Sequence, residues 1–294
     1  MQKPLDTLSG RPADGAMRFS KMHGAGNDFV ILDLRDGGQF DPELCSLIAD
    51  RHLGVGCDLI LGIEDPLDDG AVASYRIWTS DGSLSRQCGN GARCIAAWLL
   101  REGSATGRSF CLDSPSGRIP VEVVSDMFFR IGMGHPSFEP AAIPLADTYV
   151  ALDLYPLTLP DGDILKIAAV SMGNPHAVIE VPDIRCAQVE RIGVAVRKAP
   201  RFPEQVNVGF AEVVSRHRIR LRVHEFGAGE TRACGTGACA AAATFMSQGR
   251  LDRSVTVSLP GGDLQIHWPD NTSEMHLDGP AAFAYEGEFF HASL

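Results

Sequence analysis

The sequence predicts an α+β fold of two homologous, pseudo-symmetric halves, each a mostly antiparallel sheet wrapped around one central apolar helix. A cysteine–glycine motif occurs twice, as CGNGARCIAAWLL at 88–100 and CGTGACAAAATFM at 234–246, and both copies lead into apolar runs of helix-forming residues. An asparagine before a strand-like run precedes each copy, Asn27 by 61 positions and Asn174 by 60. Short strand patterns outnumber helical ones. Both motifs repeat in the same order at matching spacing, which indicates an internal duplication.

The length, composition and charge of the chain indicate a globular protein and argue against some kinds of binding partner. Its 294 residues allow two domains with a core each, and 45% apolar with 21% charged residues is typical of globular rather than disordered proteins. A formal charge of −11 argues against nucleic acid or an anionic membrane as partner. Apolar runs stay shorter than the roughly 20 residues that span a bilayer. We therefore expect a cytoplasmic protein that acts on a small molecule.

The eight cysteines do not suggest a metal site or a disulfide scaffold. None forms a C-x-x-C pair, so a structural zinc site is not expected, and metal ligands are assigned to none of them. Disulfide scaffolds belong to short secreted chains, and residues 1–16 lack the apolar segment of a signal peptide. We expect reduced thiols and a disordered extension over 1–16.

The first half is assigned to 17–133, together with a returning segment at 279–294. Asp41 can cap a short helix whose first position suits Pro42, and Asp-Gly and Ser-Pro-Ser-Gly turns separate the strands. The expected elements are a strand–turn–strand over 17–34, a helix over 42–52, strands at 59–64 and 73–83, the first cysteine helix, and short strands over 109–133.

The second half is assigned to 134–278 and repeats this order. It opens on a linker at 134–144, which carries three prolines without periodicity. The expected elements are a strand–turn–strand over 164–181, a helix over 184–194, a strand at 206–214, a strand leading into the second cysteine helix, and strands at 253–259, 264–268 and 274–277. The last run, 281–290, is expected to pack back on the first half.

The duplicated cysteine turns indicate proton-transfer chemistry. The first amides of a helix lack partners within it and carry partial positive charge, so they bind anions. A cysteine at this position is expected to have a lowered pKa. Two such thiols across one pocket suit inversion of a stereogenic carbon, in which one thiolate removes a proton and the other thiol supplies one to the opposite face. This reaction needs no cofactor.

Five sequence blocks, in order from about residue 17 to the C-terminus, resemble the diaminopimelate epimerases, a pyridoxal-independent family of amino-acid racemases and epimerases. The blocks are KMHGAGNDFVILD, QCGNGARC, SMGNPHAV, VNVGF and GAGETRACGTGACA. The resemblance implies that Cys88 and Cys234 are the acid/base pair, that no cofactor is used, and that a homodimer is compatible with the family.

The resemblance also assigns residues that contact an amino-acid substrate. These are the amides of Gly89, Asn90, Gly235 and Thr236 for the α-carboxylate, Asn27 and Glu225 for the α-amino group, and Asn174 and Asn207 at the far end of the substrate. His23 and His176 lie near these blocks and are expected to be structural. The six other cysteines are expected to pack in the core.

The chain departs from the family pattern at the far end of the substrate. Phe226 stands where members acting on diaminopimelate show the arginine of Glu-Arg-Gly, and Leu59, Thr79 and Leu84 replace Gln, Asn and Glu. Losing a charge-assisted clamp of this kind costs about 2–5 kcal/mol of binding. A substrate other than diaminopimelate is therefore expected, such as histidine or another amino acid with an aromatic or uncharged side chain. The alternatives are a genuine diaminopimelate epimerase and a non-catalytic amino-acid-binding protein.

Overall fold

The computed structural model describes residues 16–35, 37–85, 88–146, 148–160, 162–204 and 206–290. The extension expected over 1–16 lies outside these ranges except for Ala16, which begins the first strand. Among the described helices, none is both long and apolar enough to cross a membrane.

The strands form two matching series. Those of the first half are β1 (Ala16–Gly24), β2 (Asn27–Asp33), β3 (Leu59–Glu64), β4 (Ala73–Trp78), β5 (Ser109–Ser114), β6 (Gly117–Ser125) and β7 (Phe128–Gly132). Those of the second half are β9 (Ile164–Ser171), β10 (Pro175–Glu180), β11 (Asn207–Ser215), β12 (Arg218–Glu225), β14 (Ser254–Leu259), β15 (Gly262–His267) and β16 (His276–Pro280).

The two series pair in the same order and with the same sense. From β1 to β7 successive neighbours are antiparallel, parallel, antiparallel, parallel, antiparallel and antiparallel. The series β9, β10, β11, β12, β14, β15, β16 repeats this alternation step for step. The last strands of the two series, β7 and β16, pair antiparallel with each other and join the halves. The predicted two-part α+β architecture is confirmed.

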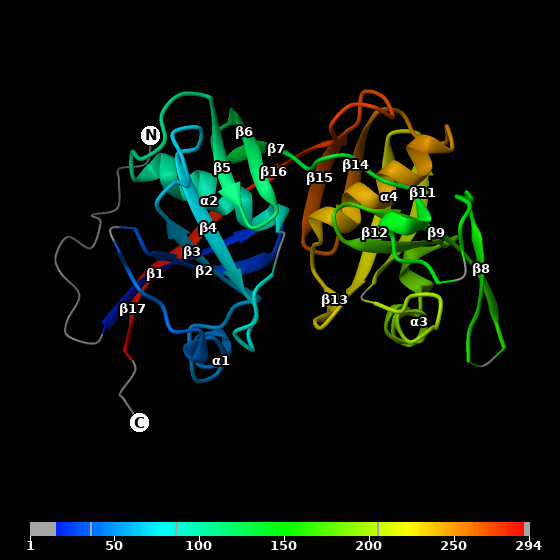
Figure 1. Ribbon diagram of the computed structural model, residues 1–294, viewed down its shortest axis with the longest axis horizontal. Coiled ribbons are helices and arrows are strands. Elements are labelled where there is room, and N and C mark those ends of the chain that lie inside the picture. The colour runs from blue at the N-terminus through cyan, green and yellow to red at the C-terminus, as the bar shows by residue number, and fades with distance from the viewer. Residues whose placement is uncertain are drawn as a thin grey trace.

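Additional strands extend these sheets. The final strand β17 (Ala282–Phe290) pairs with β1, so the end of the chain returns to the first half as expected; in Figure 1 the red β17 lies beside the blue β1. The short β8 (Tyr155–Thr158) pairs with β9, and β13 (Gly229–Thr231) pairs with β12. The sequence did not predict β8, which contains Pro156; proline is confined to edge strands because it cannot donate to the ladder.

The central helices are α2 (Gly89–Arg101) and α4 (Gly235–Ser247), one on each side of Figure 1. Every residue of α4 from 235 to 246 is buried, as expected for a helix that is apolar on all sides. Its one interior hydroxyl, Thr244 Oγ1, donates to Ala240 O at 2.9 Å and so adds no unpaired polar group to the core. Side chains of both helices belong to a single hydrophobic cluster, so the two halves share a core.

The two peripheral helices differ in extent from the prediction. α1 covers Cys45–Ala49 after a 3₁₀ turn, and ends early because Asp50 Oδ1 accepts from the amides of His52 and Leu53, each at 2.7 Å. α3 covers Val189–Arg197, later than the expected 184–194. The start of the expected helix forms a separate 3₁₀ turn, Ile184–Cys186, capped by Asp183, while the end of α1 is set by the hydrogen bonds of Asp50.

Candidate active site

Cys88 and Cys234 occupy equivalent positions, the N-caps of α2 and α4. Each has extended backbone, and each sulfur accepts a hydrogen bond from the third amide of its helix: Gly91 N to Cys88 Sγ at 3.3 Å and Gly237 N to Cys234 Sγ at 3.4 Å. The sulfurs therefore satisfy amides that would otherwise have no partner. The sequence placed both cysteines correctly.

The two helix N-termini adjoin each other. A methyl group added to Gly235 would lie 3.8 Å from Gly89 Cα and 3.3 Å from Leu277 Cδ1. Asn90 Nδ2 crosses between the halves and donates to Ala233 O at 3.3 Å, beside Cys234. Glycine at 235 permits this close approach. The first-turn amides named by the sequence, those of residues 89, 90, 235 and 236, are therefore gathered at one place, where their partial positive charges add.

A buried amide network surrounds Cys88. Asn27 begins β2, and its Oδ1 lies 3.8 Å from Cys88 Sγ and accepts from Asn90 Nδ2 at 3.2 Å. Its own Nδ2 donates to Asp58 Oδ2 at 2.8 Å. The predicted Asn27 thus lies at the first thiol, held by an aspartate that precedes β3.

A carboxylate stands beside Cys234. The Cys234 thiol donates to Glu225 Oε2 at 3.1 Å, and the Thr231 hydroxyl donates to the other oxygen of Glu225. Thr236 Oγ1 lies 3.6 Å from the same sulfur. Glu225, at the end of β12, is thus brought to the second thiol much as Asn27 is to the first.

Asp58 and Arg93 belong to this network and were missed at the sequence level. Arg93 is fully buried in α2 and donates to Asn90 Oδ1 at 2.7 Å, Gly89 O at 3.3 Å and Pro280 O at 3.2 Å. A signal was present, because a charged residue within an apolar helix must find partners when it is buried. Asp58 carried no comparable signal, since its contact depends on the β2–β3 pairing.

The thiol pKa values differ from the expectation of a lowered pKa. Burial raises the pKa of Cys88 to about 12, against the opposing effect of the Gly91 amide. Burial and the carboxylate of Glu225 raise the pKa of Cys234 well above its ordinary value. Desolvation outweighs the helix amides at both positions, so both thiols are protonated in the free protein at neutral pH. A bound ammonium group between them would favour the thiolate.

The asparagines assigned to the far end are held by short contacts in the second half. Asn174 Nδ2 donates to Thr236 Oγ1 at 3.5 Å, and its Oδ1 lies 3.1 Å from His176 Nε2. Burial lowers the pKa of His176 to about 3, so this ring is neutral, in keeping with a structural role. Asn207 Oδ1 accepts from the backbone amide of Phe226 at 2.8 Å.

The four departing positions are not gathered in this way. Phe226 follows Glu225 directly, is 45% exposed, and stacks under Arg197, whose Cζ lies 4.7 Å from the ring centroid. Leu59 packs on the core at the start of β3, and Leu84 is 65% exposed. Thr79 Oγ1 is held within its own turn by Asp81 Oδ1 at 2.6 Å. Two of the four directly follow residues of the described network in the chain: Phe226 follows Glu225, and Leu59 follows Asp58.

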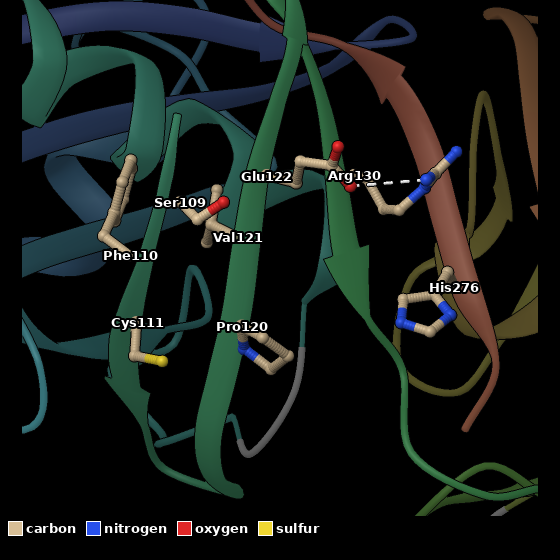
Figure 2. Close-up of a pocket in the computed structure, with 8 residues that line it drawn as sticks. All are labelled: Ser109, Phe110, Cys111, Pro120, Val121, Glu122, Arg130 and His276. Carbon is tan, nitrogen blue, oxygen red and sulfur yellow. Dashed lines mark hydrogen bonds and ion pairs between the residues drawn. The ribbon is translucent and has the colours of Figure 1, made fainter. Parts of the chain in front are cut away.

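A separate cavity of about 340 Å³ lies over β5, β6, β7 and β16 (Figure 2). It is lined by Cys111, His276 and Arg130 among others, and neither Cys88 nor Cys234 contributes to it. Arg130 is neutralised, since it donates to Asp278 at 2.8 Å and to Glu122 at 3.3 Å, the contact drawn in the figure. Arg130 thus offers no free charge to a ligand of this cavity. Of the six cysteines expected to be buried structural thiols, Cys111 is only partly buried and Cys186 is exposed, whereas the other four are buried as expected: Cys45, Cys57, Cys94 and Cys239. Across the described ranges, histidine, cysteine and acidic side chains form no cluster that could hold a metal ion.

The family model for diaminopimelate epimerase matches residues 19–139 and 168–284. The chain belongs to the diaminopimelate epimerase family. An O-ureido-serine racemase of Streptomyces lavendulae is 59% identical, over 94% of this chain and 96% of its own. A diaminopimelate epimerase of Xanthomonas euvesicatoria pv. vesicatoria is 53% identical, over 96% and 99%. The protein is accordingly an isomerase, an amino-acid racemase or epimerase of this family.

Solved structures extend the likeness of fold. A hydroxyproline epimerase of Agrobacterium vitis superposes with a TM-score of 0.72 at 13% identity, covering 94% of this chain and 93% of that one. A structure described as that of a probable proline racemase of Agrobacterium radiobacter K84 gives a TM-score of 0.70 at 14% identity, with 92% coverage of both chains. At such low identity these structures support the fold alone.

Proposed function

We propose that this protein racemises a free α-amino acid with an uncharged, hydrogen-bonding side chain, using Cys88 and Cys234 as the two bases and no cofactor. O-ureido-serine, the substrate named for the 59% identical relative, is the first candidate. Histidine, the candidate from the sequence, belongs to the same uncharged class near neutral pH.

The site residues suggest how the reaction proceeds. The α-carboxylate lies at the adjoining N-termini of α2 and α4, where unpaired amides stabilise the charge that develops as the α-carbon loses its proton. Asn27 and Glu225 hold the ammonium group beside the two sulfurs. One thiolate takes the α-proton and becomes a thiol, while the opposite thiol gives its proton to the other face and becomes a thiolate. The net change is inversion, with the protonation states of the two sulfurs exchanged.

Phe226 is the observation that carries the choice of substrate. Its backbone amide donates to Asn207 Oδ1, and it directly follows Glu225, the residue that contacts Cys234, in the chain. Its ring lies under Arg197. An aromatic ring cannot form the paired hydrogen bonds that an arginine gives to a carboxylate. A substrate without a second charged carboxylate is therefore favoured.

Epimerisation of LL-diaminopimelate is the second candidate. It is favoured by the 53% identical relatives and by Arg197, whose guanidinium lies over the Phe226 ring and brings a positive charge to this region. Arg197 Nε is buried and has no hydrogen-bond partner among the described residues, so this atom can still donate.

The test is α-proton exchange in heavy water, without added pyridoxal phosphate, read by mass spectrometry. The panel contains O-ureido-L-serine, L-histidine and LL-diaminopimelate. We expect fast exchange with the first and loss of exchange in Cys88→Ala and in Cys234→Ala. Leu53→Ala, at an exposed position away from the network, serves as the matched control and retains exchange.

Three outcomes of this exchange assay would contradict the proposal. Exchange with LL-diaminopimelate alone would refute the argument from Phe226 and leave the second candidate. Binding of an amino acid without exchange would indicate a non-catalytic amino-acid-binding protein. Exchange that survives Cys88→Ala would refute the two-thiol mechanism itself.

A further inference from the structure

Arg93 is a buried cation without a counter-ion. Its side chain is 0% exposed, and within the described residues no carboxylate lies within 4.0 Å of its guanidinium. Its partners are neutral oxygens: Asn90 Oδ1, Gly89 O and Pro280 O. Burial lowers the pKa of Arg93 to about 10, so the group remains charged at neutral pH. The carboxylate of Asp278 favours the charged form of Arg93 without a direct ion pair, and it is itself paired with Arg130. A buried charge whose direct partners are all neutral is costly to keep, which points to a function beyond packing.

The contacts of Arg93 lead to Cys88. Arg93 fixes the amide of Asn90 through Oδ1, which turns Asn90 Nδ2 toward Asn27 Oδ1 at 3.2 Å. Asn27 Oδ1 in turn lies 3.8 Å from Cys88 Sγ. The guanidinium of Arg93 therefore orients Asn90, and Asn90 together with Asp58 orients Asn27 at the first thiol.

The second thiol has the opposite surroundings. Arg93 follows Cys88 by five positions, and the residue five positions after Cys234 is Cys239, which is buried and uncharged. The charged neighbour of Cys234 is instead Glu225, at 3.1 Å. A thiol can donate to this carboxylate, whereas a thiolate there would face a like charge.

We propose that Arg93 is a positioning residue that makes the two thiols unequal. It orients Asn90 and Asn27 and places a positive charge behind Cys88, so that Cys88 gives up its proton more readily and Cys234 keeps its own. In the enzyme's first encounter with substrate, Cys88 is then the base and Cys234 the acid.

The other ionisable groups around the thiols agree with this inequality. In the described chain, Cys88 is faced by Arg93 and Cys94 on its own helix, by Glu225 on β12 and by Tyr75 on β4. Burial raises the pKa of Cys94 and of Tyr75, so both stay neutral, and it also raises the pKa of Glu225 above its ordinary value. Arg93 lowers the pKa of Cys88 and Glu225 raises it. For Cys234, Glu225 raises the pKa both by its charge and by its hydrogen bond.

The test measures the alkylation of each cysteine by iodoacetamide as a function of pH, without substrate, with peptides resolved by mass spectrometry. The variants are Arg93→Met, which removes the charge at similar length, and Arg93→Lys, which keeps it. Arg218→Met, at an exposed ion pair with Asp263, is the control. Because only the thiolate reacts, the alkylation rate below the pKa is proportional to the thiolate fraction. The ratio of the rates of one cysteine in the variant and in the unmodified protein, at the same pH, therefore reports the change in its pKa.

In Arg93→Met we expect the pKa of Cys88 to rise by about one unit, which slows alkylation of Cys88 at fixed pH about tenfold, while the rate at Cys234 changes less than about twofold. In Arg93→Lys the rate at Cys88 stays within about threefold of the unmodified protein. An unchanged rate at Cys88 in Arg93→Met, or an equal slowing of both cysteines, overturns the proposal.

Should Arg93→Met fail to fold, the lysine variant still decides. A tenfold loss at Cys88 in folded Arg93→Lys would show that the charge is not what favours the thiolate. The inference rests on the proposed pairing of Cys88 and Cys234. The alkylation profiles need no substrate, however, so they can fail while exchange succeeds, and exchange can fail while the profiles hold.

Discussion

Restoring an arginine at position 226 should convert the substrate preference, provided that Arg197 is changed as well. A charge-assisted clamp on a distal carboxylate is worth about 2–5 kcal/mol, which corresponds to a gain of about 30-fold to several thousand-fold in kcat/KM for LL-diaminopimelate. Phe226 is 45% exposed, so an arginine there keeps access to solvent and need not be buried.

Arg197 opposes this gain in the single variant. Its Cζ lies 4.7 Å from the centre of the ring that the new side chain would replace. Two guanidinium groups about 5 Å apart repel by about 1–3 kcal/mol at effective dielectric constants between those of water and a protein surface. This repulsion cancels the lower end of the expected gain. Phe226→Arg/Arg197→Gln should therefore outperform Phe226→Arg about tenfold.

The assay is α-proton exchange with LL-diaminopimelate, compared with exchange of the enzyme's own substrate. Phe226→Met is the matched control, because it removes the ring without adding charge and should show no gain. Two results would refute the reasoning. One is a folded double variant with less than about threefold gain. The other is an unmodified enzyme that already exchanges diaminopimelate and loses this activity in Arg197→Gln, which would make Arg197 the clamp.

Three further predictions concern the network and the thiols. Asn90→Ala removes hydrogen bonds to three buried groups, Asn27 Oδ1, Ala233 O and the Arg93 guanidinium. It should lower the free energy of unfolding in urea by about 3–6 kcal/mol. The control Asn271→Ala, at an exposed position, should change this free energy by less than about 0.5 kcal/mol. Because burial lowers the pKa of His176 to about 3, the unfolded chain takes up a proton near pH 6.5 that the folded one refuses. The free energy of unfolding should thus be at its full value above pH 6.5 and about 2–3 kcal/mol lower at pH 4.5. An equally steep fall of the free energy of unfolding with pH in His176→Gln would contradict this. Mild oxidation should join Cys88 and Cys234 in a disulfide and abolish exchange, and reductant should restore it; an oxidised, active enzyme that contains this linked peptide would rule out the pair.

Much of the fold could be predicted from the sequence because the same order of motifs and strand-like runs occurs in both halves of the chain. The two C-G-x-G-A motifs located α2 and α4, and turn residues separated most strands correctly. The end of α1 and the start of α3 were less predictable. Asp50 accepts from amides beyond α1 at 2.7 Å, and Asp183 caps a separate 3₁₀ turn, Ile184–Cys186, by accepting from Arg185 N at 2.9 Å. The strand β8 was missed because its proline contradicts an interior strand but is allowed at an edge.

The sequence by itself determined the family and the place of Cys88 and Cys234 at helix N-termini, because short motifs carry the resemblance and encode local backbone preferences. Only the tertiary structure decided how the thiols differ. Arg93 reaches the surroundings of Cys88 through Asn90, and Glu225 accepts from Cys234. The packing of the fold, rather than spacing along the chain, brings these groups together. It also reversed the expected direction of the thiol pKa values. The helix amides, which favour a thiolate, are local in the chain, whereas desolvation depends on how the whole fold covers the sulfurs. Desolvation has the larger effect on both thiol pKa values.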